Sequence, residues 1–265
     1  MNDNITALAS SPLVIGATGG SGTRVVARIA RSAGYDLGSH LNDAEDALEF
    51  VGFHDRWINR VMAAERRPLS SGETDQMICD FHSALRRHLP THGESGQLWG
   101  WKAPRSIYFL PFFHSLFPAL KFIHVLRDGR DMAFSDNQNQ LRQHGRVILS
   151  WRERWFAAGP LRSILLWDRV NRRAASYGEA QLGCNYLAVR FEDLCRTPTR
   201  TAERILCFLG SKIDAQQVAD AEISPPATLA RWKTRPEGIT QKLNAAAATS
   251  LCKFGYLQEA AGRGG

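Results

Sequence analysis

The sequence predicts an α/β fold: a central parallel sheet with helices on both of its faces, in three layers. Three observations lead to this prediction. Short apolar runs at 13–17, 120–126 and 186–189 alternate with stretches of helical periodicity, an order typical of a parallel sheet. The first run leads through a glycine-rich turn directly into a helix. The 265 residues, 44% hydrophobic and 22% charged, suffice for a large core, and we expect a single domain over residues 1–265.

The first two helices are predicted from periodicity and from signals at their ends. Apolar residues recur at helical spacing over 25–33, and Gly34 ends this helix. Asn42 and Glu45, three residues apart, have the form of a capping box. They predict a long helix that begins there and ends just before Pro68.

The rest of the chain continues the alternation of helices and strands. The predicted elements are a helix ending before Pro90, a strand over 98–101, a short helix over 106–117, a strand over 120–126, a helix that follows residues 127–131 and continues through residue 143, helices over about 147–158 and 160–180, a strand over 186–189 and a helix that follows Pro198 and ends at Gly210.

Charge and cysteine content narrow the classes of function. Lys and Arg outnumber Asp and Glu by 33 to 26, a net charge of +7, which suits an anionic nucleotide or an acidic substrate. No dense basic run with interleaved aromatic residues occurs, so we expect no nucleic-acid partner. Five scattered cysteines without a CxxC pair predict free thiols in a reducing compartment, with neither a disulfide framework nor a metal site.

Targeting and membrane segments are not evident in the sequence. The N-terminus lacks a basic region followed by an apolar core, so no signal peptide is expected. The most apolar stretch, 107–126, contains Pro111, His114, Pro118 and Lys121, which makes it a poor membrane span and a good helix followed by a strand. We therefore expect a cytoplasmic protein without a membrane span.

The glycine-rich turn after the first strand predicts an anion-binding loop. Glycines let the backbone approach a ligand closely, and the free N–H groups at the start of the next helix point into the turn. A plain strand-to-helix turn is the alternative, but it needs fewer glycines and hydroxyls. The residues that would form the cradle for a phosphate or sulfate are Gly19, Gly20, Ser21, Gly22, Thr23 and Arg24.

Two common nucleotide-binding loops do not fit this turn. A Walker A loop needs Gly-Lys-Ser/Thr beginning five positions after its first glycine, but Ser21 stands five positions after Gly16 and the loop has no lysine. A dinucleotide fingerprint on Gly20 and Gly22 would need glycine or alanine at the position of Val25.

A second anchor follows the predicted strand over 120–126. Arg127 stands at the end of that strand, within the run Arg-Asp-Gly-Arg-Asp, and Ser135 lies eight residues further on, in the predicted helix. Ligands of open α/β sheets bind beyond the carboxyl ends of the strands, where an arginine fork and a hydroxyl can hold a phosphate. The alternative is a solvated cluster of ion pairs, in which Asp128 and Asp131 neutralise Arg127 and Arg130.

Together the two anchors resemble those of sulfotransferases that use 3′-phosphoadenosine-5′-phosphosulfate (PAPS). Residues 101–105 resemble that family's Lys-x-Pro element and residues 189–194 its Arg-Tyr-Glu-Asp-Leu element, so the matches extend over residues 13 to about 210 in the family's order. The resemblance implies a P-loop-NTPase-like fold, PAPS as co-substrate and adenosine 3′,5′-bisphosphate as product. It also implies that residues 19–24 hold the 5′-phosphosulfate and that Arg127 and Ser135 hold the 3′-phosphate.

The chain departs from the family pattern at two positions. Many members have Lys or Arg where Gly20 stands, so Arg24 or Lys102 would have to supply the charge of the loop. Phe191 replaces a common tyrosine; its ring can still pack near adenine, without the hydroxyl.

Candidate catalytic residues follow from the chemistry of sulfuryl transfer, which resembles phosphoryl transfer. Lys102, at a predicted strand end, is the candidate cation near the bridging oxygen; a solvated surface lysine is the alternative. Asp46 is the candidate general base, because family members place a carboxylate shortly after the first helix; its alternative role is to stabilise a helix N-terminus. Asp43 and His54 are the second choices for the base.

Three functions remain compatible with the sequence. The first is a sulfotransferase that moves the sulfuryl group to a hydroxyl or amine of a small-molecule, carbohydrate or peptide acceptor. The second is a P-loop nucleotide or small-molecule kinase, which the missing Gly-Lys-Ser/Thr disfavours. The third is a non-catalytic module that binds a nucleotide or polyanion. Fold does not identify the acceptor.

Overall fold

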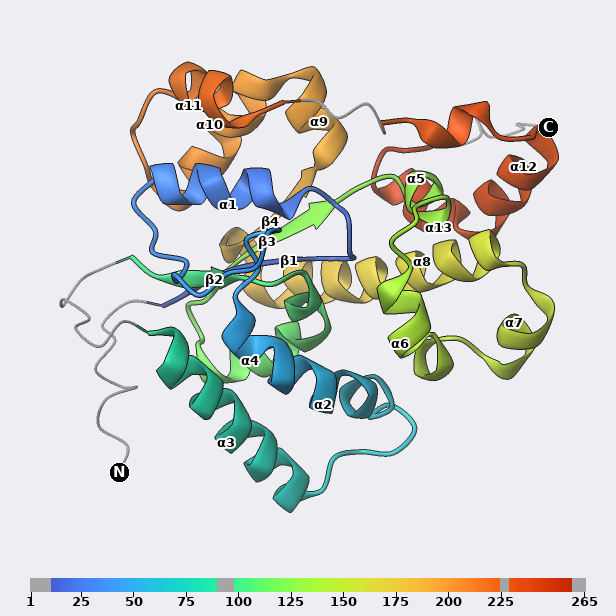
Figure 1. Cartoon of the computed structure of the whole chain (residues 1–265), viewed down its shortest axis with the longest axis horizontal. Helices are drawn as coiled ribbons and strands as arrows, with labels where there is room; N and C mark the ends of the chain where they lie inside the picture. Colours follow the sequence, from blue (N-terminus) through green and yellow to red (C-terminus); the bar gives the residue numbers. More distant parts are fainter. Residues whose placement is uncertain (1–10, 90–97, 225–228, 259–265) are drawn as a thin grey trace.

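The computed structural model describes residues 11–89, 98–224 and 229–258, and the centre of the described part is a four-stranded parallel sheet (Figure 1). The chain goes from the first strand to an edge and then crosses to the other side, so the topology switches at the carboxyl ends of β1 and β3, where open α/β sheets bind ligands. The strands, in the spatial order β2-β1-β3-β4, are β1 (Leu13–Ala17), β2 (Gly100–Lys102), β3 (Lys121–Leu126) and β4 (Tyr186–Arg190).

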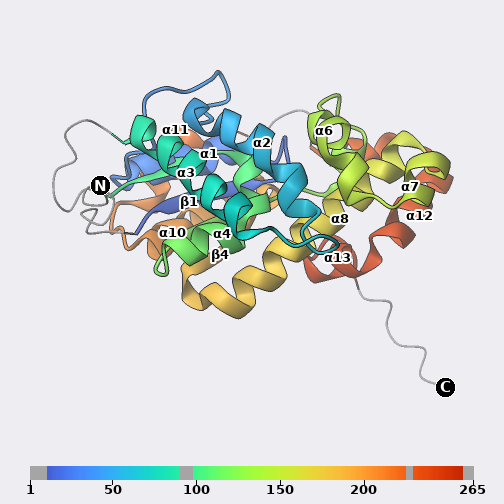
Figure 2. The ribbon, with the colours of Figure 1, turned by 90° about the horizontal axis from the view of Figure 1, so that it is seen from below.

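Helices cover both faces of the sheet, which confirms the three predicted layers (Figures 1 and 2). Leu13 and Ile15 of β1 pack into the core on one face, whereas Val14 packs into the core on the other; this alternation is the period of a strand. The first face carries α1 (Thr23–Ser32), α10 (Pro198–Leu209) and α11 (Ala215–Glu222), and the second α2 (Val51–Met62), α3 (Ser71–His88), α4 (Leu110–Leu116) and α8 (Gly159–Tyr177).

The remaining helices are short and lie mainly beyond the carboxyl edge of the sheet. In the part of the chain that the structure describes, every helix is too short or too polar to cross a lipid bilayer. These helices are α5 (Gly129–Ala133), α6 (Asn139–Ile148), α7 (Trp151–Phe156), α9 (Phe191–Arg196), α12 (Glu237–Ala246) and α13 (Ala248–Lys253).

The capping box predicted at Asn42 and Glu45 is wrong, and no helix begins there. The Asn42 side chain accepts hydrogen bonds from the N–H groups of Ala44 and Asp46, both at 2.9 Å, so it closes a local turn. Glu45 has a φ of 63°, which a right-handed helix does not allow. The helical segment starts only at Leu48, as a 3₁₀ turn that leads into α2, so Asp46 lies in a loop.

The helix predicted to follow residues 127–131 and to continue through residue 143 is not formed as one piece. It forms α5 and α6, separated by residues 134–138. Ser135 therefore lies just beyond the end of α5 and not within a helix, and its hydroxyl accepts a hydrogen bond from the N–H of Asn137 at 3.3 Å. The break follows from this side-chain turn, which competes with the helical ladder.

Candidate active site

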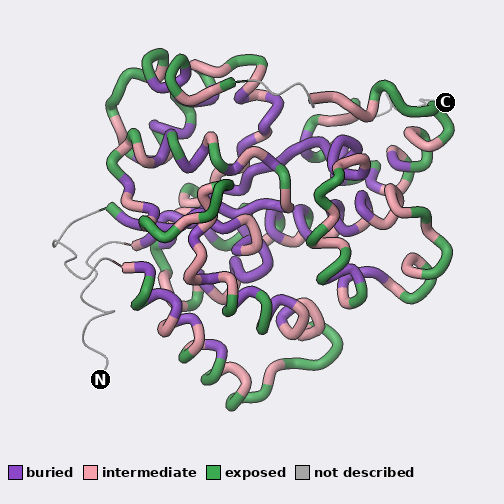
Figure 3. Tube along the Cα trace, viewed as in Figure 1, coloured by how far each residue is buried: buried purple, intermediate pink, exposed green. Residues whose placement is uncertain are grey.

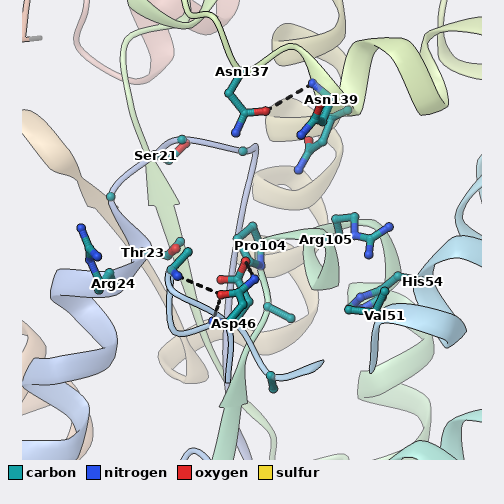
Figure 4. Close-up of a pocket in the computed structure, with 18 of the residues that line it drawn as sticks. Ser21, Thr23, Arg24, Asp46, Val51, His54, Pro104, Arg105, Asn137 and Asn139 are labelled. Atoms are coloured by element: carbon teal, nitrogen blue, oxygen red, sulfur yellow. Dashed lines mark hydrogen bonds between the residues drawn. The ribbon is translucent and has the colours of Figure 1, made fainter. Parts of the chain in front are cut away.

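A cavity of about 630 Å³ lies at the carboxyl edge of the sheet, where the glycine-rich turn, the loop before α2 and the start of α6 meet (Figure 4). Arg24 lies on one side of this space and His54 and Arg105 on the other, with Asp46 between them (Figure 4). The predicted site residues that line the cavity are Gly19, Gly20, Ser21, Gly22, Thr23, Arg24, Asp43, Asp46, His54 and Arg127.

The glycine-rich turn is shaped by two residues in the left-handed region. Gly20 has a φ of 79° and Gly22 a φ of 81°, so both positions favour glycine. A Cβ on Gly22 would also lie 2.2 Å from the ring of Phe191. The Ser21 hydroxyl donates to the carbonyl of Thr18 at 2.6 Å, and this hydrogen bond stabilises the turn. The helix α1 begins at Thr23, so its unpaired backbone N–H groups come immediately after the turn.

Arg127 extends from the end of β3 to the same turn. Its guanidinium donates to the carbonyl of Gly20 at 3.3 Å, lies 3.5 Å from the Asp131 carboxylate and stacks over the Phe191 ring at 5.4 Å. The ring of Phe191 is buried, supports both Gly22 and Arg127, and is not among the residues that line the cavity. Its contact with adenine stays a prediction.

The second arginine of the same motif has a structural partner. The Arg130 guanidinium lies 2.7 Å from Asp128 and also donates to the carbonyl of Tyr256 at 2.8 Å. Asp131 accepts hydrogen bonds from the backbone N–H groups of Ala230 and Trp232. The ion-pair cluster that the sequence allowed is therefore present, but it leaves Arg127 on the cavity wall. Ser135, by contrast, is not among the residues that line the cavity.

Lys102 and Asp46, 56 positions apart in the sequence, form an ion pair. The Lys102 ammonium lies 2.5 Å from the Asp46 carboxylate and also donates to the carbonyl of Ala44. Lys102 is 1% exposed, whereas the Asp46 side chain is 26% exposed and lines the cavity. Burial lowers the pKa of Lys102 below its ordinary value, and the neighbouring Asp46 opposes this shift. Lys102 thus lies behind the carboxylate and holds it toward the cavity.

The loop over 41–47, here the acidic loop, is fixed at a second point that the sequence did not reveal. Glu45 lies 2.8 Å from the Arg28 side chain and is also paired with Arg31, both from α1. Burial alone would raise the pKa of Glu45, but the two guanidinium groups lower it below its ordinary value. Arg24, which lies one turn before Arg28 in α1, donates a hydrogen bond to the carbonyl of Asp43 at 3.2 Å. Three arginines of one helix therefore hold the loop that carries Asp46.

His54 belongs to α2 and lines the wall of the cavity opposite Arg24 (Figure 4). The residue is 1% exposed, and its Nε2 has no hydrogen-bond partner among the described residues. Burial and the nearby positive charge of Arg105 lower the pKa of His54 well below its usual value, so the ring is neutral at pH 7. The neutral ring of His54 therefore faces the same space as Asp46.

Four amide side chains complete the cavity and were missed from the sequence. They come from the break before α6 and from its first turns, which the sequence placed inside a longer helix. The Tyr108 hydroxyl donates to Gln140 at 2.9 Å, which fixes one of them. The four residues are Asn137, Asn139, Gln140 and Gln143.

Comparisons with known proteins agree on one family. The model of the "Sulfotransferase family" matches residues 12–215. The fold is similar to the sulfotransferase domain of the Synechococcus PCC 7002 olefin synthase, with 18% identity, a TM-score of 0.52, and coverage of 91% of this chain and 94% of that chain. It is also similar to the sulfotransferase STF9 from Mycobacterium avium, with 12% identity, a TM-score of 0.56, and coverage of 94% and 78%. A search of curated protein sequences found no match.

Proposed function

The chain belongs to the sulfotransferase family, and on that premise we propose that it moves the sulfuryl group of PAPS to a hydroxyl or amine of an acceptor and releases adenosine 3′,5′-bisphosphate. One observation carries the proposal. An anion-binding turn, an arginine from a neighbouring strand end and a carboxylate held by a buried lysine all line one cavity. These are the groups needed to bind a multiply charged donor and to take a proton from an acceptor.

The donor side of the cavity is assigned to the turn over 19–24 and to Arg127. The open N–H groups at the start of α1 and the positive end of its dipole suit the 5′-phosphosulfate. Arg24 lines the cavity and is exposed, so it supplies the charge that other members place at the position of Gly20. Arg127 holds the 3′-phosphate through its guanidinium fork. Ser135 and Phe191 do not line the cavity, and their assignment to this phosphate and to the adenine rests on the family resemblance.

Asp46 acts as the general base and Lys102 positions it. The acceptor hydroxyl gives its proton to the Asp46 carboxylate as its oxygen forms the new bond to sulfur, while the bond from sulfur to the phosphate oxygen breaks. The ammonium of Lys102 holds the carboxylate in place. Lys102 is buried and does not line the cavity, so its charge acts on the leaving phosphate from behind Asp46. His54 is the alternative base, because its neutral ring faces the same cavity.

The acceptor is a small molecule, a carbohydrate or a peptide that enters between the acidic loop, α2 and α6. This wall contains the amides of Asn137, Asn139 and Gln140 beside a few apolar groups such as Val51, so hydrogen bonding to a polar acceptor is favoured.

A transfer assay with PAPS labelled on sulfur tests this function. The purified chain is incubated with the label and with separate panels of phenols, sterols, saccharides and tyrosine peptides, with and without a magnesium chelator. We expect label in at least one acceptor and no dependence on magnesium. Phosphate transfer from ATP that requires magnesium would instead indicate a kinase. Tight binding of adenosine 3′,5′-bisphosphate with no transfer to any panel would indicate a non-catalytic module.

A further inference from the structure

Helix α7 presents its aromatic side chains to solvent and its acidic side chain to the protein. Trp151 is 57% exposed, and Trp155 and Phe156 are each 80% exposed. None of the six described residues of α7 is buried, and the helix lies at one end of the molecule (Figures 2 and 3). Trp151 and Trp155 are four residues apart, so they share one face of the helix. This arrangement is the reverse of an ordinary surface helix.

Polar contacts, and not apolar burial, hold α7 in this orientation. Ser150 and Glu153 form a capping box at its start. The Glu153 carboxylate also accepts a hydrogen bond from Arg169 of α8 at 2.6 Å. A second link runs from the Arg154 guanidinium to the carbonyl of Arg146 in α6, at 3.2 Å. With the inner side of the helix committed to these contacts, the aromatic rings stay outside.

The segment that carries the aromatic side chains is rich in arginine. Residues 139–172, which comprise α6, α7 and the first part of α8, contain seven arginines and two carboxylates, Glu153 and Asp168. Both carboxylates are paired with arginines. Arg142, Arg146 and Arg152 are exposed, and Arg152 lies over the Trp151 ring at 5.3 Å. Exposed tryptophan and phenylalanine on α7, with exposed arginines on α6 and α7, therefore remain available to a partner.

We propose that the α7 patch, defined as Trp151, Trp155 and Phe156 with the exposed Arg142, Arg146 and Arg152, binds the surface of an anionic lipid bilayer. Tryptophan and phenylalanine insert at the boundary between headgroups and acyl chains, and basic side chains on the same surface are attracted to anionic headgroups. A second copy of this chain is a poorer occupant, because apposed patches would bring their arginines together and like charges repel.

Binding of the bilayer through this patch would also set the position of the cavity relative to the membrane surface. The helix next to α7 is α6, which contributes Asn139, Gln140 and Gln143 to the cavity wall and Arg142 and Arg146 to the patch. The same rigid helix therefore connects the membrane-facing patch with the acceptor side of the site. The lipid-binding patch itself does not depend on which reaction the cavity performs.

Sedimentation with vesicles tests the proposal on the full chain. Wild-type protein is mixed with sucrose-loaded vesicles of phosphatidylglycerol and phosphatidylcholine, or of phosphatidylcholine alone. We expect binding to the anionic vesicles, a blue shift of tryptophan emission on binding, and weaker binding at high salt. Trp155→Glu/Phe156→Glu should lower the affinity by roughly tenfold or more, because two inserting rings are lost and two added carboxylates are repelled by the anionic headgroups.

Matched variants distinguish binding through the α7 patch from non-specific adsorption to vesicles. Ile213 is exposed at 39% on a distant loop, so Ile213→Glu should bind vesicles like the wild type. Arg146→Gln/Arg152→Gln should weaken binding to anionic vesicles while near-UV circular dichroism stays unchanged. Equal binding to neutral vesicles, or wild-type affinity in Trp155→Glu/Phe156→Glu, would overturn the proposal. A dimer in solution that this double variant converts to a monomer would also overturn it, in favour of a contact between copies.

Discussion

Replacing Asp46 with Asn is expected to destabilise the protein and to slow transfer for two separable reasons. The variant leaves the buried Lys102 ammonium without its counter-ion, although the contact with the Ala44 carbonyl persists. Breaking a fully buried pair costs about 3–5 kcal/mol. Because the Asp46 side chain is 26% exposed, we expect about 2–3 kcal/mol, or a melting temperature lower by roughly 5–10 °C.

The catalytic effect is measured on the same variant. Loss of the base should lower kcat by about 100-fold or more and remove the acidic limb of its pH profile, while the affinity for adenosine 3′,5′-bisphosphate changes far less. Lys102→Met/Asp46→Asn removes both charges, so it should regain most of the lost melting temperature and yet stay inactive. Asp43→Asn replaces an exposed carboxylate on the same cavity and is the matched control. It should keep the melting temperature and the kcat of the wild type.

Thermal denaturation, pH–rate profiles and calorimetric titration together decide this prediction. An Asp46→Asn variant with a lower melting temperature but an unchanged kcat would refute the role of Asp46 as base. The pair with Lys102 would then support the acidic loop alone, and the base would be Asp43 or His54. A double variant that regains activity along with stability would refute the role of Asp46 equally.

Three further predictions concern the nucleotide site and the core. Arg127→Ala should weaken the binding of adenosine 3′,5′-bisphosphate by roughly 2–4 kcal/mol, and Ser135→Ala should weaken it by about 1 kcal/mol. An unchanged affinity of Arg127→Ala in calorimetric titration would contradict the assignment. Gly22→Ala should abolish nucleotide binding, because its φ of 81° and the Phe191 ring 2.2 Å from the new Cβ exclude the side chain; a normal thermal shift with ligand would show otherwise. Burial lowers the pKa of His124 to about 4, so the unfolded chain takes up this proton first as pH falls. Urea unfolding should therefore show stability falling by up to about 1.4 kcal/mol per pH unit between roughly pH 6.5 and 4, with a shallower slope in His124→Gln; an identical slope would contradict it.

The strands, the glycine-rich turn and the place of Arg127 could be predicted because their signals are local. The run over 13–17 is apolar and leads into a glycine-rich turn, and β1 occupies those same residues. Lys102 was expected at a strand end and is the last residue of β2. Arg127 follows β3 directly. In each case the strand, its end and the residue beyond it are adjacent in sequence, so no knowledge of distant contacts was needed.

The prediction for the loop before α2 was wrong because the Asn42 side chain can form two kinds of structure. Asn42 accepts hydrogen bonds from backbone N–H groups in a capping box and in a side-chain turn alike. What decides between them is the position of Glu45, which Arg28 and Arg31 of α1 hold at a φ of 63°. Those arginines are 17 and 14 positions away, and no spacing rule connects them to the loop.

The wall of the cavity was beyond sequence reasoning for a similar reason. Residues 137–143 were placed inside one helix, whereas the break after α5 turns several of their amides toward the site. The pairing of Lys102 with Asp46 joins residues 56 positions apart, so their individual roles could be inferred but not their contact.

The central claim, that this cavity binds PAPS, is tested most directly by comparing adenosine 3′,5′-bisphosphate with AMP in calorimetric titrations of the wild-type chain. The two ligands differ only by the 3′-phosphate that Arg127 is assigned to hold. We predict that the bisphosphate binds at least roughly tenfold more tightly, since a charge-assisted contact contributes about 1.5–3 kcal/mol, and that Arg127→Ala removes most of the difference. Equal affinity for the two nucleotides in the wild type would contradict the account.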